Sequence, residues 1–481
     1  MEEVQDAWRD RVGHTLIHSG YVVTVNSARD VFPGGFVAVD GARIVSTGPS
    51  QDTPPVDGFD EVIDASGCIV VPGLINMHQH HWYTLFKGLA DGYELEEWFT
   101  GFVLPLMAHL SDDAMRLSSY VAAMEMLATG TTCSLNHSVT PTTPGTVRAT
   151  IEPQVEVGIR QVYAKELRCR TRGNPTHPLS LPEALAAFQE EVARWNGAAD
   201  GLVRTAMAME TNAHWVAAGM RTEELILEGY ALARKLDHRI TGHAMTGTYS
   251  LEKGFLKFFR ETGRTEVRYL MQLGILDPHW LLIHGVHVTE VDIEHMARVG
   301  CSLVYTPTAE TKVGYGITPV SNVHRAGVNV ALGTDGPMMD YSVDMVEQMK
   351  LCSLTQHVRH LDPTRMPPER ILEMATINAA KALGLEAELG SLEAGKRADI
   401  AIFNLKKPHV GVLHRPLSSF LYAGRGSDAH TVLVDGRVVF REGGFPRFPD
   451  GARAIAEAER LGRSIAEKAG LGHRFAMAWP R

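Results

Sequence analysis

Strand-like and helix-like segments alternate along most of this chain, and this order limits the folds that it can adopt. The alternation starts with the apolar run at Cys68 and gives eight β-then-α units before Leu383. The helix-like segments carry apolar residues at helical spacing, as in 112–128, where Ser111 is a candidate N-cap. A repeated β-then-α order implies right-handed crossovers and a parallel sheet. Eight units over about 300 residues predict a (β/α)8 barrel, the TIM-barrel fold of the α/β class.

The segments on either side of this region consist of short strands joined by turns. Strand-like runs fill 15–64, with turn signals at Asp40-Gly41 and Ser66-Gly67, and they return at 398–441. A segment of about 60 residues is too short to form a stable sandwich alone. We therefore predict a small β-sandwich domain built from both ends of the chain, at 14–70 and 389–445. The barrel domain is expected at 71–388, and a helical extension at 446–481.

Composition excludes several classes of function. The chain has 481 residues, 44% of them hydrophobic, and a net charge of −10 from acidic residues dispersed along it. This pattern argues against a nucleic-acid partner, and no apolar run approaches membrane-spanning length. The five cysteines are far apart and stand mostly in apolar runs, as buried free thiols in a reducing compartment do. Because the N-terminus has no signal-peptide core, we expect a cytoplasmic protein.

Two histidines stand at the carboxyl end of the first strand expected in the barrel. The run Cys68–Ile75 is apolar and reads as one buried strand, and His78 and His80 follow it. Residues two apart in a strand point to the same face, so the two imidazoles share a face. Imidazole is a ligand for zinc, iron and copper. The pair is therefore a candidate metal site, although two polar loop residues are the simpler alternative.

Later strands add three more candidate ligands at their carboxyl ends. His243 follows the fifth expected strand, His284 ends the sixth and Asp335 ends the eighth. In a (β/α)8 barrel the carboxyl ends of the strands form the catalytic rim. A metal held by three of these four histidines and the aspartate keeps one position open for water, as catalytic sites require. A bound metal lowers the pKa of that water.

Several motifs give the chain a resemblance to a known superfamily, over about Thr15 to Gly444. They are PGLINMHQH, GTTCSLNH, TGH at 241–243, IHGVHVT at 283–289, GITPV at 316–320, GTDGP at 333–337, MATINAAKALGL at 374–385 and GSLEAGKRADI at 390–400. With these motifs the chain resembles the amidohydrolase superfamily, in the branch of cytosine and guanine deaminases and triazine chlorohydrolases.

The resemblance implies a ligand set, a cofactor and an assembly. It implies that His78, His80, His243 and Asp335 bind one divalent metal, zinc or alternatively iron. It also implies that His284 orients the attacking water or polarises the substrate, and that Asp335 takes a proton from that water. Relatives often assemble, so a homo-oligomer that acts on a small-molecule substrate is expected.

One departure from the superfamily pattern bears on the reaction. Deaminases of this kind carry a proton-shuttling Glu three residues after the fifth-strand histidine, and here that residue is Thr246. Threonine can hydrogen-bond but is not an acid near neutral pH. Glu210, after the fourth strand, and Glu310, after the seventh, are candidate substitutes in catalysis.

Each of these glutamates has an alternative interpretation. Glu210 could pair with Lys165 or Arg168 and Glu310 with Lys312, as structural ion pairs. A further possibility is that Glu210 or Glu166 ligates a second metal.

Aromatic side chains gather directly after the first barrel strand. We expect Trp82 and Trp98 to contact the substrate, together with Thr246 and with His137 at the end of the second strand. Apolar walls with a few polar groups suit an aromatic small molecule. The alternative is that most of these rings belong to the core or to a subunit contact.

The sequence thus predicts a metal-dependent hydrolase of carbon–nitrogen, non-peptide bonds in a small aromatic or heterocyclic molecule, of the deaminase type. An alternative is hydrolysis of a urea, carbamate or halogenated-ring substrate, because such leaving groups need less proton transfer. A second alternative is an inactive barrel with a binding or assembly role.

Overall fold

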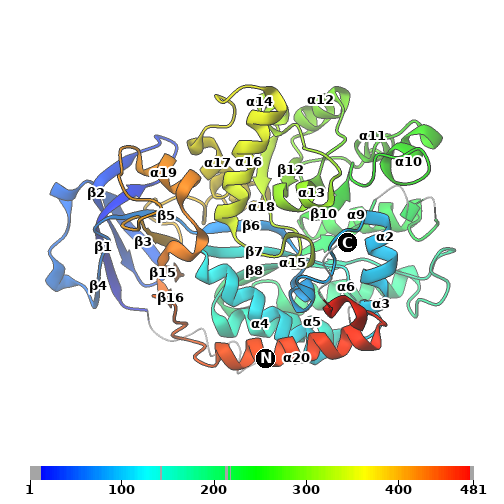
Figure 1. Ribbon diagram of the computed structural model, residues 1–481, viewed down its shortest axis with the longest axis horizontal. Coiled ribbons are helices and arrows are strands. Elements are labelled where there is room, and N and C mark those ends of the chain that lie inside the picture. The colour runs from blue at the N-terminus through cyan, green and yellow to red at the C-terminus, as the bar shows by residue number, and fades with distance from the viewer. Residues whose placement is uncertain (1–11, 141–142, 212–214, 217, 477–481) are drawn as a thin grey trace.

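The computed structural model describes residues 12–476 except 141–142, 212–214 and 217, so the last five residues of the expected C-terminal extension lie outside the described residues. Two eight-stranded sheets organise the chain. One is the predicted parallel barrel, and Figure 1 shows it surrounded by helices, with the second sheet at one end of the molecule. The barrel strands follow chain order and are β6 (Leu74–Gln79), β7 (Thr131–Ser138), β8 (Arg160–Glu166), β9 (Val203–Ala208), β10 (Ile240–Ala244), β11 (Trp280–His284), β12 (Ser302–Tyr305) and β13 (Asn329–Leu332).

Side-chain and backbone hydrogen bonds join the last barrel strand to the first. The Asn76 amide donates to Thr334 Oγ1 at 2.8 Å, and the Thr334 backbone N–H donates back to Asn76 Oδ1 at 3.1 Å. The Asp335 N–H also donates to the His78 carbonyl at 2.9 Å. These bonds bring Asp335, which follows β13, beside the histidines that follow β6.

Helices cover the outside of the barrel, as the amphipathic pattern predicts. Ser111 is the N-cap of α4, where its side chain accepts a hydrogen bond from the Ala114 N–H. The segment 368–383 forms two helices, because Thr376 between them has a non-helical backbone conformation. The covering helices are α4 (Asp112–Ala128), α5 (Pro144–Val157), α6 (Leu181–Trp195), α9 (Glu223–Lys235), α11 (Glu266–Gln272), α12 (Glu290–Val299), α14 (Val320–Arg325), α16 (Met345–His360), α17 (Pro368–Met374) and α18 (Ile377–Leu383).

The second sheet combines strands from both ends of the chain, as the sequence predicts. It is one mixed sheet in the order β16-β15-β14-β5-β1-β2-β3, with β4 paired in parallel to β1. A helix of the C-terminal region, α20 (Gly451–Lys468), lies along the barrel beside α4 (Figure 1). The strands are β1 (His14–Val23), β2 (Val31–Asp40), β3 (Arg43–Gly48), β4 (Glu61–Asp64), β5 (Cys68–Pro72), β14 (Ile400–Asn404), β15 (Ala429–Val434) and β16 (Arg437–Arg441).

The run Cys68–Ile75, predicted as one strand, passes from one sheet to the other. Residues up to Pro72 belong to β5 of the mixed sheet, and Leu74 begins β6 of the barrel. Gly73 lies between them, and a Cβ atom there would come within 2.1 Å of Thr132 Oγ1. The one-strand prediction is wrong because an apolar run shows burial on both sides but does not show which sheet buries it.

A buried ion-pair cluster joins the barrel to the mixed sheet. Arg160, the first residue of β8, lies 3.0 Å from Asp399 and 2.6 Å from Asp435, and all three side chains are buried. Asp399 precedes β14 and Asp435 stands in the turn between β15 and β16. Arg160 begins a barrel strand, and the two carboxylates stand at the ends of strands of the mixed sheet, so the cluster fixes the two sheets to each other.

Replacing Arg160 with Met should therefore destabilise the protein. Removing one partner of a buried ion pair leaves uncompensated buried charge and costs roughly 3–5 kcal/mol. The free energy of unfolding, from denaturant titration followed by fluorescence, measures this loss. Arg148→Met is the control, because Arg148 is exposed and lies 3.9 Å from Glu152. Equal unfolding midpoints for the two variants would contradict the prediction.

Candidate active site

Five ionisable side chains meet at the carboxyl ends of the barrel strands. His78 and His80 lie at the end of β6, His243 in β10, His284 at the end of β11 and Asp335 just after β13. Candidate ligand atoms of His78, His80 and Asp335 lie within 4.8 Å of one another, and so do those of His78, His243 and His284. Four separate strands therefore deliver these groups to one point, as the (β/α)8 order predicts.

The second ring nitrogen of two of the histidines is held by a polar partner. His80 Nδ1 lies 2.6 Å from the His137 carbonyl oxygen, to which it donates, and this leaves Nε2 facing Asp335 at 3.4 Å. His243 Nδ1 lies 2.6 Å from Glu210 Oε1. Partners of this kind fix the orientation and tautomer of a metal-ligating imidazole.

The chemistry of this cluster fits a bound divalent metal. Both ring nitrogens of His78 are buried and have no hydrogen-bond partner among the described residues, which is costly for polar atoms unless another ligand binds them. Burial lowers the pKa of His80 to about 3 and that of His78 well below its usual value, so both rings are neutral and can donate a lone pair. Burial acts to raise the pKa of Asp335, but contact with His78 and the nearby histidines lower it overall, which keeps the carboxylate ionised.

Backbone strain coincides with the cluster. His284 has φ of +78°, Asp335 has +61° and Met245, near His243, has +51°. These values lie in the left-handed region, which non-glycine residues rarely adopt and which is found preferentially at functional sites.

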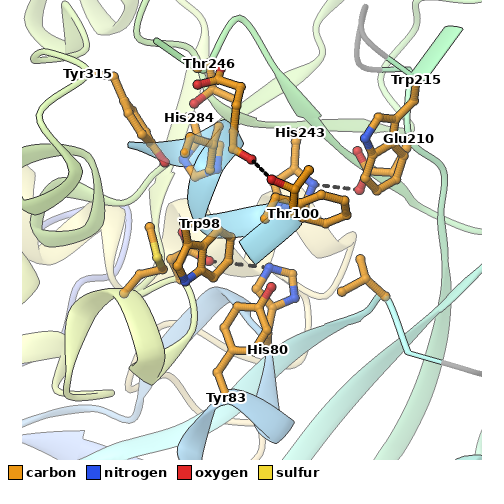
Figure 2. Close-up of a pocket in the computed structure, with 17 residues that line it drawn as sticks. His80, Tyr83, Trp98, Thr100, Glu210, Trp215, His243, Thr246, His284 and Tyr315 are labelled. Atoms are coloured by element: carbon orange, nitrogen blue, oxygen red, sulfur yellow. Dashed lines mark hydrogen bonds and ion pairs between the residues drawn. The ribbon is translucent and has the colours of Figure 1, made fainter. Parts of the chain in front are cut away.

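Four members of the cluster, all except His78, form the floor of a cavity of about 260 Å³. Most of its wall is apolar, and much of it comes from the segment after β6, which comprises η3 (His81–Phe86), α2 (Leu95–Trp98) and η4 (Phe99–Val103). Figure 2 shows His80, His243 and His284 facing the cavity, with aromatic rings on several sides. The lining residues are His80, Tyr83, Leu95, Glu96, Trp98, Phe99, Thr100, Val139, Glu210, Trp215, His243, Thr246, Gly247, His284, Tyr315, Asp335 and Met339.

The predicted substrate contacts take up different places around this cavity. Trp98 and Thr246 line it. Trp82 is buried outside the lining, with its ring centroid 4.4 Å from that of Tyr83 and 5.9 Å from that of Phe86. His137 is also buried outside the lining, where its Nε2 lies 2.8 Å from Glu210 Oε1.

The two candidate glutamates both lie next to active-site histidines. Glu210 lies between His137 and His243, and it reaches the cavity wall. Glu310 is fully buried, and its Oε1 lies 3.6 Å from His284 Nδ1.

The structural ion pairs considered for these glutamates are not formed. Arg168 pairs with Glu166 at 2.5 Å instead of with Glu210, and Arg221 binds the other oxygen of Glu166. Lys312 pairs with Asp91 at 2.7 Å instead of with Glu310. The local charge pattern failed here because the partners come from other segments of the chain.

Two aromatic lining residues, Trp215 and Tyr315, are absent from the sequence-based prediction. Tyr315 stands between Gly314 and Gly316, whose φ values are +76° and +129°. Such a Gly-Tyr-Gly turn after α13 (Pro307–Val313) is a signal that could have marked Tyr315, because the glycines permit the reversal that brings the ring to the cavity.

Comparisons with known proteins give consistent matches. The family model described as "Amidohydrolase family" matches residues 69–439. The chain is 34% identical over 452 residues to a 5-methylthioadenosine/S-adenosylhomocysteine deaminase of Desulforudis audaxviator, covering 94% of this chain and 99% of the relative. It is 32% identical over 416 residues to a 5'-deoxyadenosine deaminase of Methanothermobacter thermautotrophicus, covering 85% and 90% of the two chains.

Solved structures with the same fold include an adenosine deaminase of Xanthomonas campestris with bound zinc. It has a TM-score of 0.84 and 25% identity, covering 94% of this chain and 98% of that one. The fold is also that of an atrazine chlorohydrolase of Arthrobacter aurescens, with a TM-score of 0.82 and 22% identity, covering 93% and 100% of the two chains.

Proposed function

Since this chain belongs to the amidohydrolase family and is a metal-dependent hydrolase of carbon–nitrogen bonds, we propose that it releases an amine from a small aromatic nitrogen heterocycle. The observation that carries the proposal is a metal-ligand cluster that opens into a cavity walled by aromatic rings. Apolar walls with a few converging polar groups suit a flat heterocycle. The names of the relatives support the same class, because adenosine derivatives carry an amino group on a heteroaromatic ring.

We propose zinc as the cofactor, with iron as the alternative, held by His78, His80, His243 and Asp335. Three imidazoles and one carboxylate form a donor set typical of catalytic zinc. The metal supplies Lewis acidity, which lowers the pKa of a bound water. The buried, neutral rings of His78 and His80 supply lone pairs, and Glu210 holds the second ring nitrogen of His243.

Asp335 and His284 are proposed to manage the protons. Asp335 is ionised and lines the cavity floor, so its carboxylate can accept a proton from the attacking water. His284 also lines the floor, where it can orient the water, take up a proton that the water releases and pass that proton to the departing nitrogen. Trp98, Tyr83 and Tyr315 are proposed to contact the substrate ring, with Thr246 at the position three residues after His243.

Thr246 favours a second candidate function. A cavity without a carboxylic acid at this position gives less help to a poor leaving group. Ureas, carbamates and halogenated rings release groups that need less protonation, so hydrolysis of such compounds is the second candidate.

A substrate panel distinguishes the two candidates. Zinc-loaded protein should release ammonia or an alkylamine from aminopurines, aminopyrimidines and aminotriazines. Release of aniline from phenylureas, or of halide from halogenated triazines, together with no ammonia, would favour the second candidate. Absence of turnover across both sets would reject both.

We also propose a cytoplasmic homo-oligomer. All five cysteines are buried and free, and no described helix is long and apolar enough to cross a membrane.

An apolar stripe at the end of α16 suits contact with a second copy. It consists of Leu354, Val358 and Leu361, whose side chains are 40%, 69% and 91% exposed. Light scattering should give a mass above the 52.7 kDa of one chain, and Val358→Glu should lower it. A monomer mass for the unmodified protein would contradict this.

A further inference from the structure

Glu310 is a buried carboxyl group that has no lysine or arginine beside it in the described part of the chain. It lies in α13, and its side chain is fully buried next to His284, which lines the cavity. Among the residues that the structure describes, no lysine or arginine forms an ion pair with it, and the adjacent Lys312 binds Asp91. Burying such a group is unfavourable unless hydrogen bonds satisfy it, so its contacts indicate what it does.

A chain of hydrogen bonds joins one oxygen of Glu310 to the ring of His284. His284 Nδ1 lies 2.9 Å from Thr306 Oγ1, and the Thr306 hydroxyl donates to Glu310 Oε1 at 3.4 Å. Because Thr306 has a single proton and uses it toward Glu310, its oxygen accepts from the ring N–H. This order places the imidazole proton on Nδ1 and leaves Nε2 with its lone pair toward the cavity.

The other oxygen of Glu310 is joined to the backbone of the same histidine. Thr318 Oγ1 lies 2.7 Å from Glu310 Oε2 and 2.9 Å from the His284 carbonyl oxygen. One hydroxyl proton cannot serve both oxygens, so a protonated Glu310 that donates to Thr318 completes the set of bonds. Burial raises the pKa of Glu310, in agreement with this count.

The backbone of His284 needs such support. Its φ of +78° is strained for a residue with a side chain, and strain of this kind persists only where surrounding contacts hold it. Both threonines are fully buried, so water does not compete for these bonds. Glu310 is thus connected to the ring and to the main chain of His284, through two independent hydroxyl groups.

We propose that Glu310 is the positioning residue of His284, acting through Thr306 and Thr318 to keep Nε2 directed at the reacting atoms. In this role Glu310 does not touch the substrate. It fixes His284 in one orientation and tautomer, so that His284 can transfer protons although position 246 holds a threonine and not a glutamate. The proposal rests on the proposed function for its kinetic consequence, while its structural consequence holds for the protein without substrate.

Paired variants test the kinetic consequence. Thr306→Val removes the hydroxyl group that connects Glu310 to the His284 ring, and Thr306→Ser keeps that hydroxyl group in a side chain of similar size. We expect Thr306→Val to lower kcat by ~10- to 100-fold, the usual cost of losing such a partner, with KM changed less than ~3-fold and the zinc content unchanged. Thr306→Ser and Glu310→Gln should stay within ~3-fold of the unmodified kcat, because serine and the glutamine amide reproduce the donors and acceptors. Glu310→Leu should lower kcat as much as Thr306→Val does, because leucine can neither donate nor accept a hydrogen bond.

Nitrogen chemical shifts of isotope-labelled histidine test the structural consequence without turnover. In zinc-loaded protein, the His284 signal, assigned by its loss in His284→Asn, should report a single tautomer protonated at Nδ1. Thr306→Val should give a mixture of tautomers, and Thr306→Ser should not. Equal kcat values and equal His284 signals in Thr306→Val and Thr306→Ser would overturn the proposal. A shift difference without turnover in any variant would reject the proposed function and leave the positioning role supported.

Discussion

Replacing His243 with alanine should remove the bound metal and lower kcat/KM by a factor of about a thousand or more. His243 is the proposed ligand on β10, across the barrel from the pair at the end of β6. Metal catalysis stabilises a transition state by several kcal/mol, and each ~1.4 kcal/mol corresponds to a factor of ten in rate. The variant also leaves Glu210 with His137 as its remaining histidine partner.

Zinc content by atomic emission and kcat/KM on the best substrate of the panel measure this loss together. His414→Ala is the matched control, since His414 is an exposed histidine of the mixed-sheet region and should change neither quantity. A His243→Ala protein that keeps one zinc per chain and normal turnover would contradict the ligand assignment. Loss of zinc with unchanged turnover would instead show that catalysis does not depend on the metal.

The sequence predicts the floor of the active site well because the periodicity of the chain determines it. Residues at the carboxyl ends of parallel strands meet at one rim, so His243, His284 and Asp335 could be placed together before any distance was known. The same argument does not depend on the identity of the loops. It also holds although the run Cys68–Ile75 is two strands and not one, because His78 and His80 still stand at the carboxyl end of β6.

The walls of the cavity could not be predicted in the same way. After His80 the chain enters a 3-10 helix, in which residues three apart share a face. Tyr83 therefore faces the cavity with His80, while Trp82 turns into the core, although both rings follow the same strand. The place of Tyr315 depends on the geometry of the turn after α13. The place of Glu310 depends on hydroxyl partners at 306 and 318, which no local charge pattern shows.

Introducing a carboxylic acid at position 246 should change the reaction that the protein favours. Thr246 lines the cavity three residues after His243 and is buried. A glutamate there would lie beside the attacking water and the ring nitrogen of a bound heterocycle, and positioned acid–base groups contribute roughly 10²- to 10⁴-fold to rate. We expect Thr246→Glu to raise kcat/KM for ammonia release from aminopurines within that range. Urea, carbamate and halogenated substrates should gain much less, because their leaving groups need less protonation.

The comparison with Thr246→Gln distinguishes the effect of the carboxylic acid from the effect of side-chain size. Glutamine fills the same space and forms hydrogen bonds, but it cannot transfer a proton near neutral pH. Ammonia release measured for Thr246→Glu, Thr246→Gln and the unmodified protein, at matched zinc content, should therefore rise in the glutamate variant alone. Equal rates for the two variants would mean that proton transfer at this position does not limit amine release. In that case His284, held by Glu310, would already transfer the proton to the leaving group. Thr246 would then fit the shape of the substrate and would say nothing about the chemistry of the leaving group.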